Sequence, residues 1–491
     1  MTEPRVLAID QGTSSTKCLL IGPQGRVLAR GSAPVGIGYP EPGWVEQSPQ
    51  DIWASVGVAV AQCLQGRDAS RVAALGLSTQ RESVLLWERA TSRPVSPVLG
   101  WQDRRTVDTC RQLRGELGEL VRQRTGLPLD PMFSAPKARW LLDRFDPTRV
   151  RSARGELCLG TVDSWLTYQL LGRHEIEVGN ASRTQLLDLR TGAWSEELLA
   201  AFGVPWEVLP EVVPSAGMRG PVTGPGPLAG VPLTSVLADS HAALFAHGVR
   251  RPGPVKATYG TGSSVMGLLD PERLPALQGT DALCVTIAWH AGQLAYAVEG
   301  NILASGATLV WLAELLRVSV RDVLEMAAGS GSAGVQLVPA FRGLGAPWWD
   351  DAASGTLTGL TLGTGPEHLA RAAVESVALQ VSDVVGAIAG AVAPVDRLLA
   401  DGGLSTSDLL MQLQADVTGV PVERAREGDL SALGTAHLAG LEVGVWTEQE
   451  LATPAHDRDV FTPARQGAGA SADLASAWRT ALGRARYRAP S

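Results

Sequence analysis

Lysine is scarce in this chain of 491 residues. Only Lys17, Lys137 and Lys256 are present, so the other 39 of the 42 basic side chains are arginines. No Gly-Lys dipeptide occurs, which excludes the GxxxxGK[ST] phosphate loop of Walker-type nucleotidases. Schiff-base chemistry has few candidate lysines for the same reason. Any phosphate group must therefore be bound by backbone amides, by arginine or by a metal ion.

Cysteine and positive charge are limited too. The five cysteines lie far apart without a CxxC pair, so neither a disulfide framework nor a thiolate zinc site is predicted. A net charge of −8 argues against binding to nucleic acid or to an anionic membrane. The N-terminal residues lack the pattern of a signal peptide, and the weakly polar run Val384–Val395 is too short to span a bilayer. We therefore expect a cytoplasmic protein whose partners are small molecules.

Strands alternate with helices along the chain, which predicts an α/β fold. A strand, a Gly-Thr turn and a second strand occur at residues 5–21, and the same order returns at residues 255–269. This repeat has a period of about half the chain and indicates two duplicated domains. Gly248–Pro254 is a plausible linker, so we place the domains at residues 1–249 and 250–491. Helices are expected at 103–124 and, as a solvated amphipathic element, at about 473–486.

The two Gly-Thr turns are candidate phosphate sites. They cover Asp10–Thr16 in the first half and Gly260–Ser264 in the second. Glycine lets the backbone approach phosphate oxygens, and the exposed amides make an anion-binding concavity. An ordinary tight hairpin explains any single turn of this kind better. The presence of two turns in corresponding positions favours a site in which both turns bind one polyphosphate between them. Asp10 would hold Mg²⁺ there, directly or through water.

Two further features follow predicted strands. Asp239 ends the apolar strand 232–238 and precedes a helix, so it is either a general base or a cap of that helix. Asp401-Gly402-Gly403 precedes a helix from about Ser407 and could seat a nucleotide, although Gly-Gly turns are common. The residues alone do not decide between these readings.

Arg81 and Glu82 follow the strand 72–78, and Trp101 lies twenty residues further on. A guanidinium and a carboxylate can bind vicinal hydroxyls, while an indole covers the carbon edge of a polyol. Solvated surface charges beside a buried tryptophan are the more ordinary explanation. His241 and His247 lack a partner motif, so no metal site is predicted for them.

Together these segments resemble the FGGY carbohydrate kinases, most closely their glycerol kinases. The resemblance covers nearly the whole chain and rests on long motifs in order: AIDQGTSSTK at 8–17, YPEPGWVEQSP at 39–49, TQRES at 79–83, GWQDRRT at 100–106, ADSHAALFAHG at 238–248, TYGTGSS at 258–264, VEGNILASGATLVWL at 298–312, VPAFRGLGAPWWDDAASGTLTGLT at 338–361 and ADGGLSTSDLLMQLQADVTGVPVER at 400–424. It implies two actin-like (ribonuclease-H-like) domains with ATP in the cleft between them, and a homodimer.

The resemblance also implies roles for individual residues. Asp239 matches the catalytic base and Asp10 the metal-linked acid, while Arg81, Glu82 and Trp101 match the polyol-binding set. The positions that match the nucleotide site are Gly12, Thr13, Ser14, Lys17, Thr261, Gly262, Gly306, Val310, Gly403 and Ser407. Lys17 is placed in the first turn, where the family tends to carry arginine.

Three acceptor-site positions depart from the glycerol kinase pattern. Met132 replaces a tyrosine that would hydrogen-bond glycerol, Ser240 replaces a glutamine, and Ser264 replaces a pocket phenylalanine. In the nucleotide site, Val310 and Ser407 replace a glutamine and an asparagine. The predicted function is ATP-dependent phosphorylation of a primary hydroxyl of a small polyol, with glycerol as the default. The alternatives are a kinase for a longer polyol or a ketopentose, and a non-catalytic ATPase of the actin/heat-shock type.

Overall fold

The computed structural model describes residues 3–223, 226–274, 281–452, 458–464 and 468–488. The first half of the chain forms β1 (Arg5–Gln11), β2 (Ser15–Ile21), β3 (Val27–Pro34), β4 (Glu46–Gln47), α1 (Pro49–Leu64), β5 (Val72–Thr79), β6 (Val84–Glu88), β7 (Val98–Leu99), α2 (Val107–Thr125), α3 (Ser134–Phe145), α4 (Val150–Ala153), β8 (Leu157–Thr161), α5 (Val162–Leu171), β9 (Glu175–Glu177), α6 (Val178–Ser182), β10 (Leu187–Asp188), β11 (Ala193–Trp194), α7 (Glu196–Phe202), β12 (Glu211–Val213), β13 (Leu233–Ala238) and α8 (Asp239–Ala246).

The second half continues from there. It forms β14 (Pro254–Tyr259), β15 (Ser263–Leu269), β16 (Cys284–Ala291), β17 (Gln293–Ile302), α10 (Gly306–Leu316), α11 (Val320–Gly329), β18 (Gln336–Val338), β19 (Thr356–Thr358), α12 (Pro366–Ala391), β20 (Arg397–Asp401), α13 (Asp408–Thr418), β21 (Val422–Ala425), α14 (Leu430–Glu442), α15 (Glu448–Ala452), β22 (Arg458–Phe461) and α16 (Ala468–Ala485).

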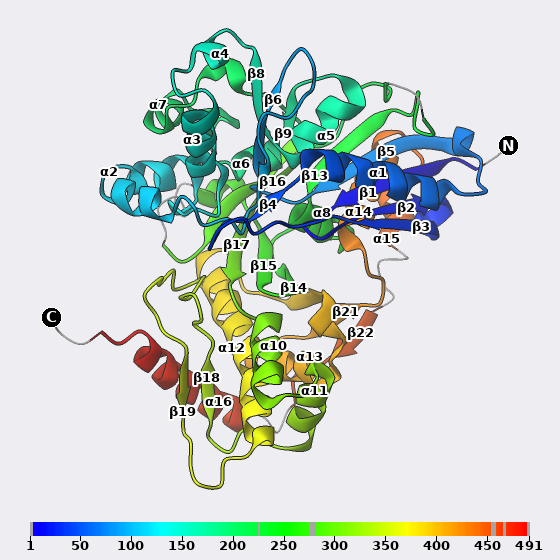
Figure 1. Ribbon diagram of the computed structural model, residues 1–491. Helices are drawn as coiled ribbons and strands as arrows, with labels where there is room; N and C mark the ends of the chain where they lie inside the picture. Colours follow the sequence, from blue (N-terminus) through cyan, green and yellow to red (C-terminus); the bar gives the residue numbers. More distant parts are fainter. Residues whose placement is uncertain (1–2, 224–225, 275–280, 453–457, 465–467, 489–491) are drawn as a thin grey trace.

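Two sheets of the same design confirm the predicted duplication. The first has the order β13-β5-β1-β2-β3, and the second contains β21-β20-β14-β15-β17 in corresponding places. In both, the first three strands are parallel and the last two run antiparallel to their neighbours. The strands read as apolar runs because helices cover the sheets. The α/β fold class is therefore confirmed, and Figure 1 shows the two lobes one above the other.

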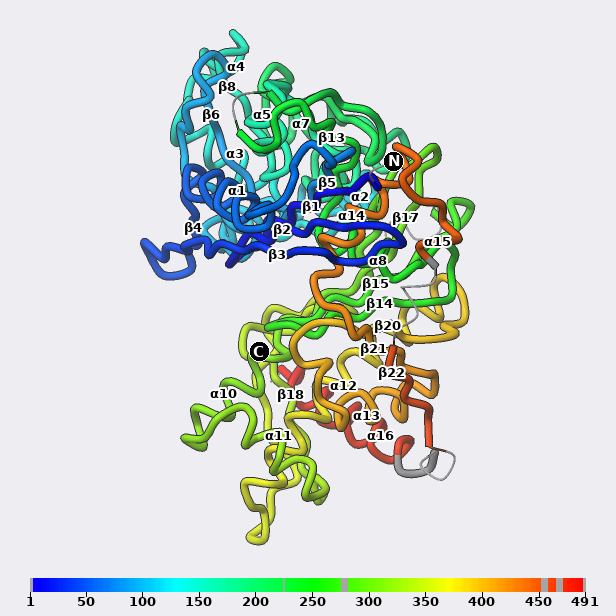
Figure 2. The backbone as a smooth tube through the Cα atoms, turned by 90° about the vertical axis from the view of Figure 1, so that its right-hand side faces the viewer, coloured from blue at the N-terminus to red at the C-terminus, as the bar shows by residue number. Residues whose placement is uncertain are grey.

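The spatial lobes do not coincide with the two sequence halves. Helix α14 of the second half packs against α8, β1, β5 and β13 of the first, so it covers the first sheet. Figures 1 and 2 both show this late segment among the early strands. The hairpin β16–β17 likewise contacts α6 of the first half. Each lobe thus contains parts of both halves of the chain, and the boundary near residue 249 stays a prediction.

Several predicted elements differ in their bounds or surroundings. Helix α2 begins four residues later than expected, because the Asp103 carboxylate accepts a hydrogen bond from the Val45 amide and belongs to a turn. Helix α16 was expected to be solvated, but it buries Trp478 and Leu482 in a core cluster with strand β18. Helix α12 is long and apolar enough to cross a membrane by length and composition, yet most of it is buried in the second lobe, as expected of a core helix.

Gly434 provides a test of the contact between α14 and α8. A Cβ atom at this position would lie 1.8 Å from the Ala242 carbonyl oxygen, so the two helix backbones meet at a point where only glycine fits. We expect Gly434→Ala to lower the free energy of unfolding by about 2–3 kcal/mol through overpacking. Gly386→Ala is the matched control: it lies inside α12 facing open space and should stabilise by about 0.5–1 kcal/mol. Urea denaturation compares the two, and equal effects would contradict the proposed close approach.

Candidate active site

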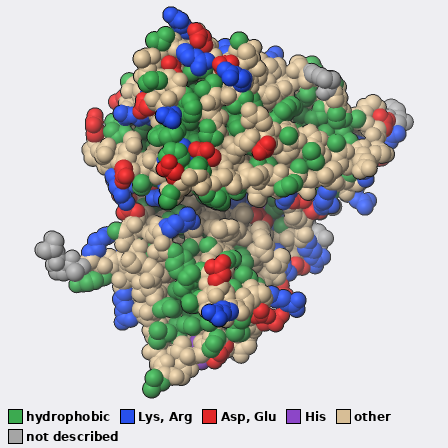
Figure 3. Space-filling model, in the orientation of Figure 1, with side chains coloured by type: hydrophobic (Ala, Val, Ile, Leu, Met, Phe, Trp, Pro, Cys, Tyr) green, Lys and Arg blue, Asp and Glu red, His purple; other side chains and the backbone are tan. Residues whose placement is uncertain are grey.

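The candidate site lies at one edge of the first sheet. Strands β1, β5 and β13 are parallel neighbours, so their carboxyl ends place Asp10, Ser78 and Asp239 close together. Ser78 Oγ donates a hydrogen bond of 2.9 Å to Asp10 Oδ1. Burial, together with the negative charge of Asp239, raises the pKa of Asp10 to about 7. Figure 3 shows the molecular surface hollowed where the two lobes meet.

Asp239 is available for chemistry in this arrangement. Ala238 occupies the N-cap of α8, and Asp239 is the first helical residue. Its Oδ1 accepts a hydrogen bond of 2.6 Å from the adjacent Ser240 amide, yet about 35% of the side chain is exposed. Burial raises the pKa of Asp239, and the guanidinium of Arg81, 3.5 Å away, opposes that rise. Asp239 therefore does not occupy the N-cap of α8, so the capping alternative is wrong at this position.

Arg81 and Glu82 are buried, so the more ordinary explanation, solvated surface charges, is wrong. Their side chains are 8% and 5% exposed, and both take part in a cluster of buried charges with Arg183 and Glu299. Glu82 has φ = 62°, a left-handed conformation that is uncommon for this residue type. Such strain is often stored at functional sites.

The first Gly-Thr turn is shorter than predicted. Strand β1 extends to Gln11 and β2 begins at Ser15, so the turn itself comprises Gly12, Thr13 and Ser14. Thr13 Oγ1 accepts a hydrogen bond of 2.9 Å from Trp101 Nε1. This bond links Trp101, one of the predicted polyol-binding residues, to the turn. Lys17 lies in β2 rather than in the turn. Its Nζ is 2.7 Å from Asp429 Oδ1, so its charge is already paired with the residue preceding α14.

The second turn packs against the start of helix α10. The Gly306 amide donates a hydrogen bond of 2.9 Å to the Gly260 carbonyl, and a Cβ on Gly306 would lie 2.7 Å from that oxygen. Thr261 and Gly262 complete the turn, and the Ala307 amide donates a hydrogen bond of 3.0 Å to the Thr261 carbonyl, so the first amides of α10 are satisfied by the turn that packs against them. Val310 is exposed on the same helix.

The third glycine turn, at residues 401–403, packs against the end of strand β14, directly before the second turn. A Cβ on Gly402 would lie 2.6 Å from the Tyr259 carbonyl oxygen, so Gly403 is next to the Gly260 turn. Ser407 differs from expectation in one respect. Its hydroxyl caps α13 by accepting a hydrogen bond from the Leu410 amide, so it is already engaged.

A buried lysine holds the backbone next to two of the predicted polyol-binding residues, Met132 and Trp101. Lys137 Nζ donates hydrogen bonds to the carbonyls of Met132 at 2.8 Å and Gly100 at 3.0 Å. Met132 packs with Phe133, Cys284 and Trp349 in a small apolar cluster. Lys137 therefore fixes the backbone of Met132 and, through Gly100, the backbone preceding Trp101.

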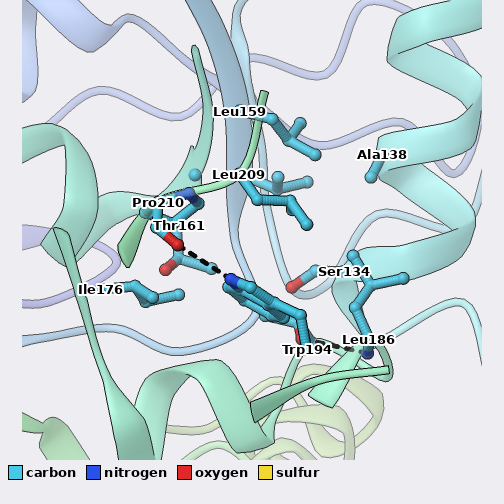
Figure 4. A pocket seen from close by; sticks show the side chains of 12 residues that line it. Ser134, Ala138, Leu159, Thr161, Ile176, Leu186, Trp194, Leu209 and Pro210 are labelled. Carbon is cyan, nitrogen blue, oxygen red and sulfur yellow. Dashed lines mark hydrogen bonds between the residues drawn. The ribbon is translucent and has the colours of Figure 1, made fainter. Parts of the chain in front are cut away.

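Neither of two cavities in the protein coincides with these residues. One, drawn in Figure 4, has a volume of about 20 Å³ and an apolar lining that includes Leu159, Ile176 and Trp194. This volume suffices for about one water molecule. The other is a groove of about 630 Å³ in the second half, beside Trp311 and Phe341. The candidate site is thus defined by converging side chains at the sheet edge.

Sequence reasoning missed Arg183 and Glu299. Glu299 lies within the VEGN segment that carries the resemblance, but no local pattern distinguishes it from a surface glutamate. Arg183 lies 101 residues from Glu82, its partner at 2.7 Å. Because these contacts join residues far apart in the chain, spacing could not reveal them.

The buried ammonium of Lys137 generates a prediction for stability. Burial lowers the pKa of Lys137 to about 8, whereas in the unfolded chain the side chain keeps its ordinary pKa of 10.5. Between these values the unfolded state binds more protons, so the native protein gains up to about 3 kcal/mol as pH rises from 8 to 10.5. Lys137→Met should lack this gain relative to wild type in urea titrations at each pH. Lys17→Met, at a half-exposed position, is the control; a difference between wild type and Lys137→Met that is constant with pH would contradict the prediction.

Comparison with known proteins now identifies the family. Models of the FGGY family of carbohydrate kinases match residues 5–246 for the N-terminal domain and residues 255–443 for the C-terminal domain. The chain is 41% identical to an apulose kinase from Pectobacterium atrosepticum, with 99% of each chain covered. It is 43% identical to a glycerol kinase from Aromatoleum aromaticum, with 98% of each covered.

Solved structures agree with this result. A glycerol kinase from Plasmodium falciparum with ADP has a TM-score of 0.91 at 25% identity and covers 99% of both chains. A xylulose kinase from Lactobacillus acidophilus has a TM-score of 0.87 at 21% identity over 98% of both chains, which supports the fold. The family models match most of the chain, and the relatives align over nearly all of it. The chain therefore belongs to the FGGY family of carbohydrate kinases, and it is an ATP-dependent phosphotransferase.

Proposed function

We propose that this kinase transfers the γ-phosphoryl group of Mg·ATP to a primary hydroxyl of a small polyol, with glycerol as the default acceptor. The observation that carries this proposal is the partly exposed Asp239 carboxylate beside Arg81, at the sheet edge where Asp10 lies one residue before the end of β1. Kinase relatives of this family support the reaction class. Membership in an enzyme family argues against the non-catalytic alternative.

In the proposed mechanism, Asp239 accepts the proton of the attacking hydroxyl. Its place at a strand end provides a rigid mount for a base. Arg81, Glu82 and Trp101 would hold the acceptor, together with Met132, Ser240 and Ser264. The Gly12 amide closes the first turn by donating to the Ser15 carbonyl, so the amides of Thr13 and Ser14, with those of Thr261 and Gly262, would stabilise charge on the phosphates. Gly306, Val310, Gly403 and Ser407 would line the rest of the nucleotide site, with Lys17 close to the first turn.

The residues at the sheet edge fit a magnesium ion. Asp10 carries a buried carboxylate that is repelled by Asp239 and has one hydrogen-bond donor, Ser78, so a cation would relieve its charge. The described residues hold no cluster of three metal-ligating side chains. This suits Mg²⁺, which usually binds through one or two carboxylates plus substrate phosphates. When bound, the ion would neutralise charge on the transferred phosphoryl group.

We also propose a cytoplasmic location and a homodimer. The five cysteines are buried and free, as expected of a reducing compartment. The dimer rests on the family resemblance.

Asp239→Asn tests the proposed base. The variant should bind ATP normally but lose at least about 10²-fold in kcat, because the amide cannot accept the hydroxyl proton. Coupled-enzyme assays of ADP release and calorimetry of nucleotide binding measure the two effects. Asp396→Asn, an exposed acid of the second half, should leave both unchanged. Near-normal turnover of Asp239→Asn would remove the residue from this role.

A second candidate acceptor is a longer polyol or a ketopentose. Met132, Ser240 and Ser264 replace a hydrogen-bonding tyrosine, a glutamine and a phenylalanine, which would remove one hydroxyl and leave room for a longer acceptor. The similarity to an apulose kinase supports an acceptor larger than glycerol.

Met132→Tyr distinguishes the two acceptors. Restoring the hydroxyl should add a hydrogen bond worth about 0.5–1.5 kcal/mol and so lower the KM for glycerol about 2–10-fold. Steady-state rates with glycerol, tetritols, pentitols and ketopentoses give the preference of wild type and variant. Met218→Tyr is the matched control, because that methionine is exposed on the surface. If wild type already prefers glycerol and Met132→Tyr changes nothing, the larger acceptor is excluded.

A further inference from the structure

A carboxylate from the second half of the chain lies at the centre of the charges around Arg81. Glu299, on β17, has a fully buried side chain. Its Oε1 accepts hydrogen bonds from Arg81 Nη2 at 2.7 Å and from Ser264 Oγ at 2.8 Å. Its Oε2 accepts one from Arg81 Nη1 at 2.9 Å and forms an ion pair with Arg183 Nη1 at 3.0 Å. Glu299 is thus fully buried with both oxygens turned to Arg81, so it is placed to hold that guanidinium rather than to contact an acceptor molecule.

The pairing with Glu299 fixes the plane of the Arg81 guanidinium. Two parallel hydrogen bonds between a guanidinium and a carboxylate define an orientation as well as an energy. The opposite edge of Arg81 then directs Nε towards Asp239 Oδ1 at 3.5 Å and Glu82 Oε1 at 3.8 Å. The orientation of Arg81 relative to Asp239 therefore depends on Glu299.

Arg183 joins the two carboxylates that flank Arg81. Its Nε donates a hydrogen bond of 2.7 Å to Glu82 Oε1, and its Nη1 pairs with Glu299. The side chain is fully buried, and its guanidinium lies 5.1 Å from the centre of the Phe133 ring. The two arginines and two glutamates form one network, with Asp239 as a further carboxylate 3.5 Å from Arg81 Nε, so loss of any one of the four unbalances the buried charge around the others.

This arrangement depends on the packing of the β16–β17 hairpin against the first half. Hairpin strand β16 contacts α6, the helix directly before Arg183. Ser182 Oγ and Thr286 Oγ1, one from each element, share a hydrogen bond of 2.7 Å. The hairpin therefore brings Glu299 to Arg183 and Arg81 as one unit.

We propose that Glu299 and Arg183 are positioning residues of the acceptor site, holding Arg81 in register with Asp239, and that Ser264 strengthens this hold. The proposal rests on the proposed function, since it assigns a role in binding the acceptor. Ser264 stands where glycerol kinases carry phenylalanine, which could not donate to Glu299. The Ser264 hydroxyl thus helps to hold Arg81 through Glu299, so this position does more than leave room for an acceptor.

Glu299→Gln tests the proposal with the full-length enzyme. The acceptor KM should rise at least about tenfold, the effect of weakening hydrogen bonds to a charged group, while the KM for ATP stays within about twofold. Ser264→Ala, which removes one donor without unbalancing charge, should raise the acceptor KM about 2–5-fold in the same sense. Glu375→Gln is the matched control: that glutamate is also buried and pairs with an arginine, Arg371 at 2.8 Å, but lies in α12. Its acceptor KM should equal that of wild type.

The double variant Arg183→Met/Glu299→Gln separates positioning from folding. It removes one charge of each sign, so its unfolding midpoint should recover relative to Glu299→Gln, whereas its acceptor KM should stay high. Recovery of both would assign the cluster to stability alone and overturn the proposal. So would an unchanged acceptor KM in Glu299→Gln, or parallel changes in the acceptor and ATP KM values. If wild type and Glu375→Gln phosphorylate no polyol or ketose, the proposed function itself fails, and this inference fails with it.

Discussion

The ion pair between Arg81 and Glu299 joins the two repeats of this chain at the point where the acceptor site is built. Arg81 follows strand β5 of the first sheet, and Glu299 belongs to β17 of the second. Both side chains are buried, and neither charge would be tolerated there alone. The pairing therefore requires the β16–β17 hairpin to pack against the first half. The positions of Glu82, Arg183 and Ser264 all follow from that contact.

Helix α14 forms a second contact between the two repeats. It crosses from the second half to cover the first sheet, where Gly434 lets it approach the backbone of α8. Asp429, directly before α14, pairs with Lys17 on β2. The catalytic candidate Asp239 begins α8, so the helix that carries it is packed against a segment of the second half. The proposed acceptor and nucleotide sites, each of which draws residues from both repeats, would thus share these supporting elements.

The scarcity of lysine has a structural counterpart. Lys137 donates to two backbone carbonyls, and Lys17 pairs with a carboxylate. Lys256 is buried and donates to the Thr258 hydroxyl. The turns at Gly12–Ser14 and Gly260–Gly262 instead present backbone amides, and the second adjoins the N-terminus of α10. In the proposed kinase mechanism, phosphate binding therefore relies on amide geometry, which a strand–turn–strand unit supplies without any basic side chain.

Local sequence patterns predicted much of the fold. Apolar runs bounded by glycine turns predicted β1, β5, β13 and β14, and the repeated strand–turn–strand unit predicted two sheets of one design, because these features depend on neighbours in the chain. Local patterns failed where packing decided the outcome. The apolar face of α16 was read as a solvated helix, since its partner β18 lies more than a hundred residues earlier. Asp103 was assigned to a helix, although its carboxylate is used by the distant Val45 amide.

For the candidate site, the sequence by itself determined the chemical groups: Asp10, Arg81, Glu82, Trp101 and Asp239, each beside a strand or turn whose signal is local. Only the strand order β13-β5-β1 showed that Asp10 and Asp239 lie close together, because the carboxyl ends of parallel neighbours meet at one edge. Only the tertiary structure decided that Arg81 and Glu82 are buried rather than solvated, and that Arg183, Glu299 and Ser264 surround them. The reason is physical: a buried charge is stable only beside its counter-charge, and the partners here lie up to 218 residues apart along the chain.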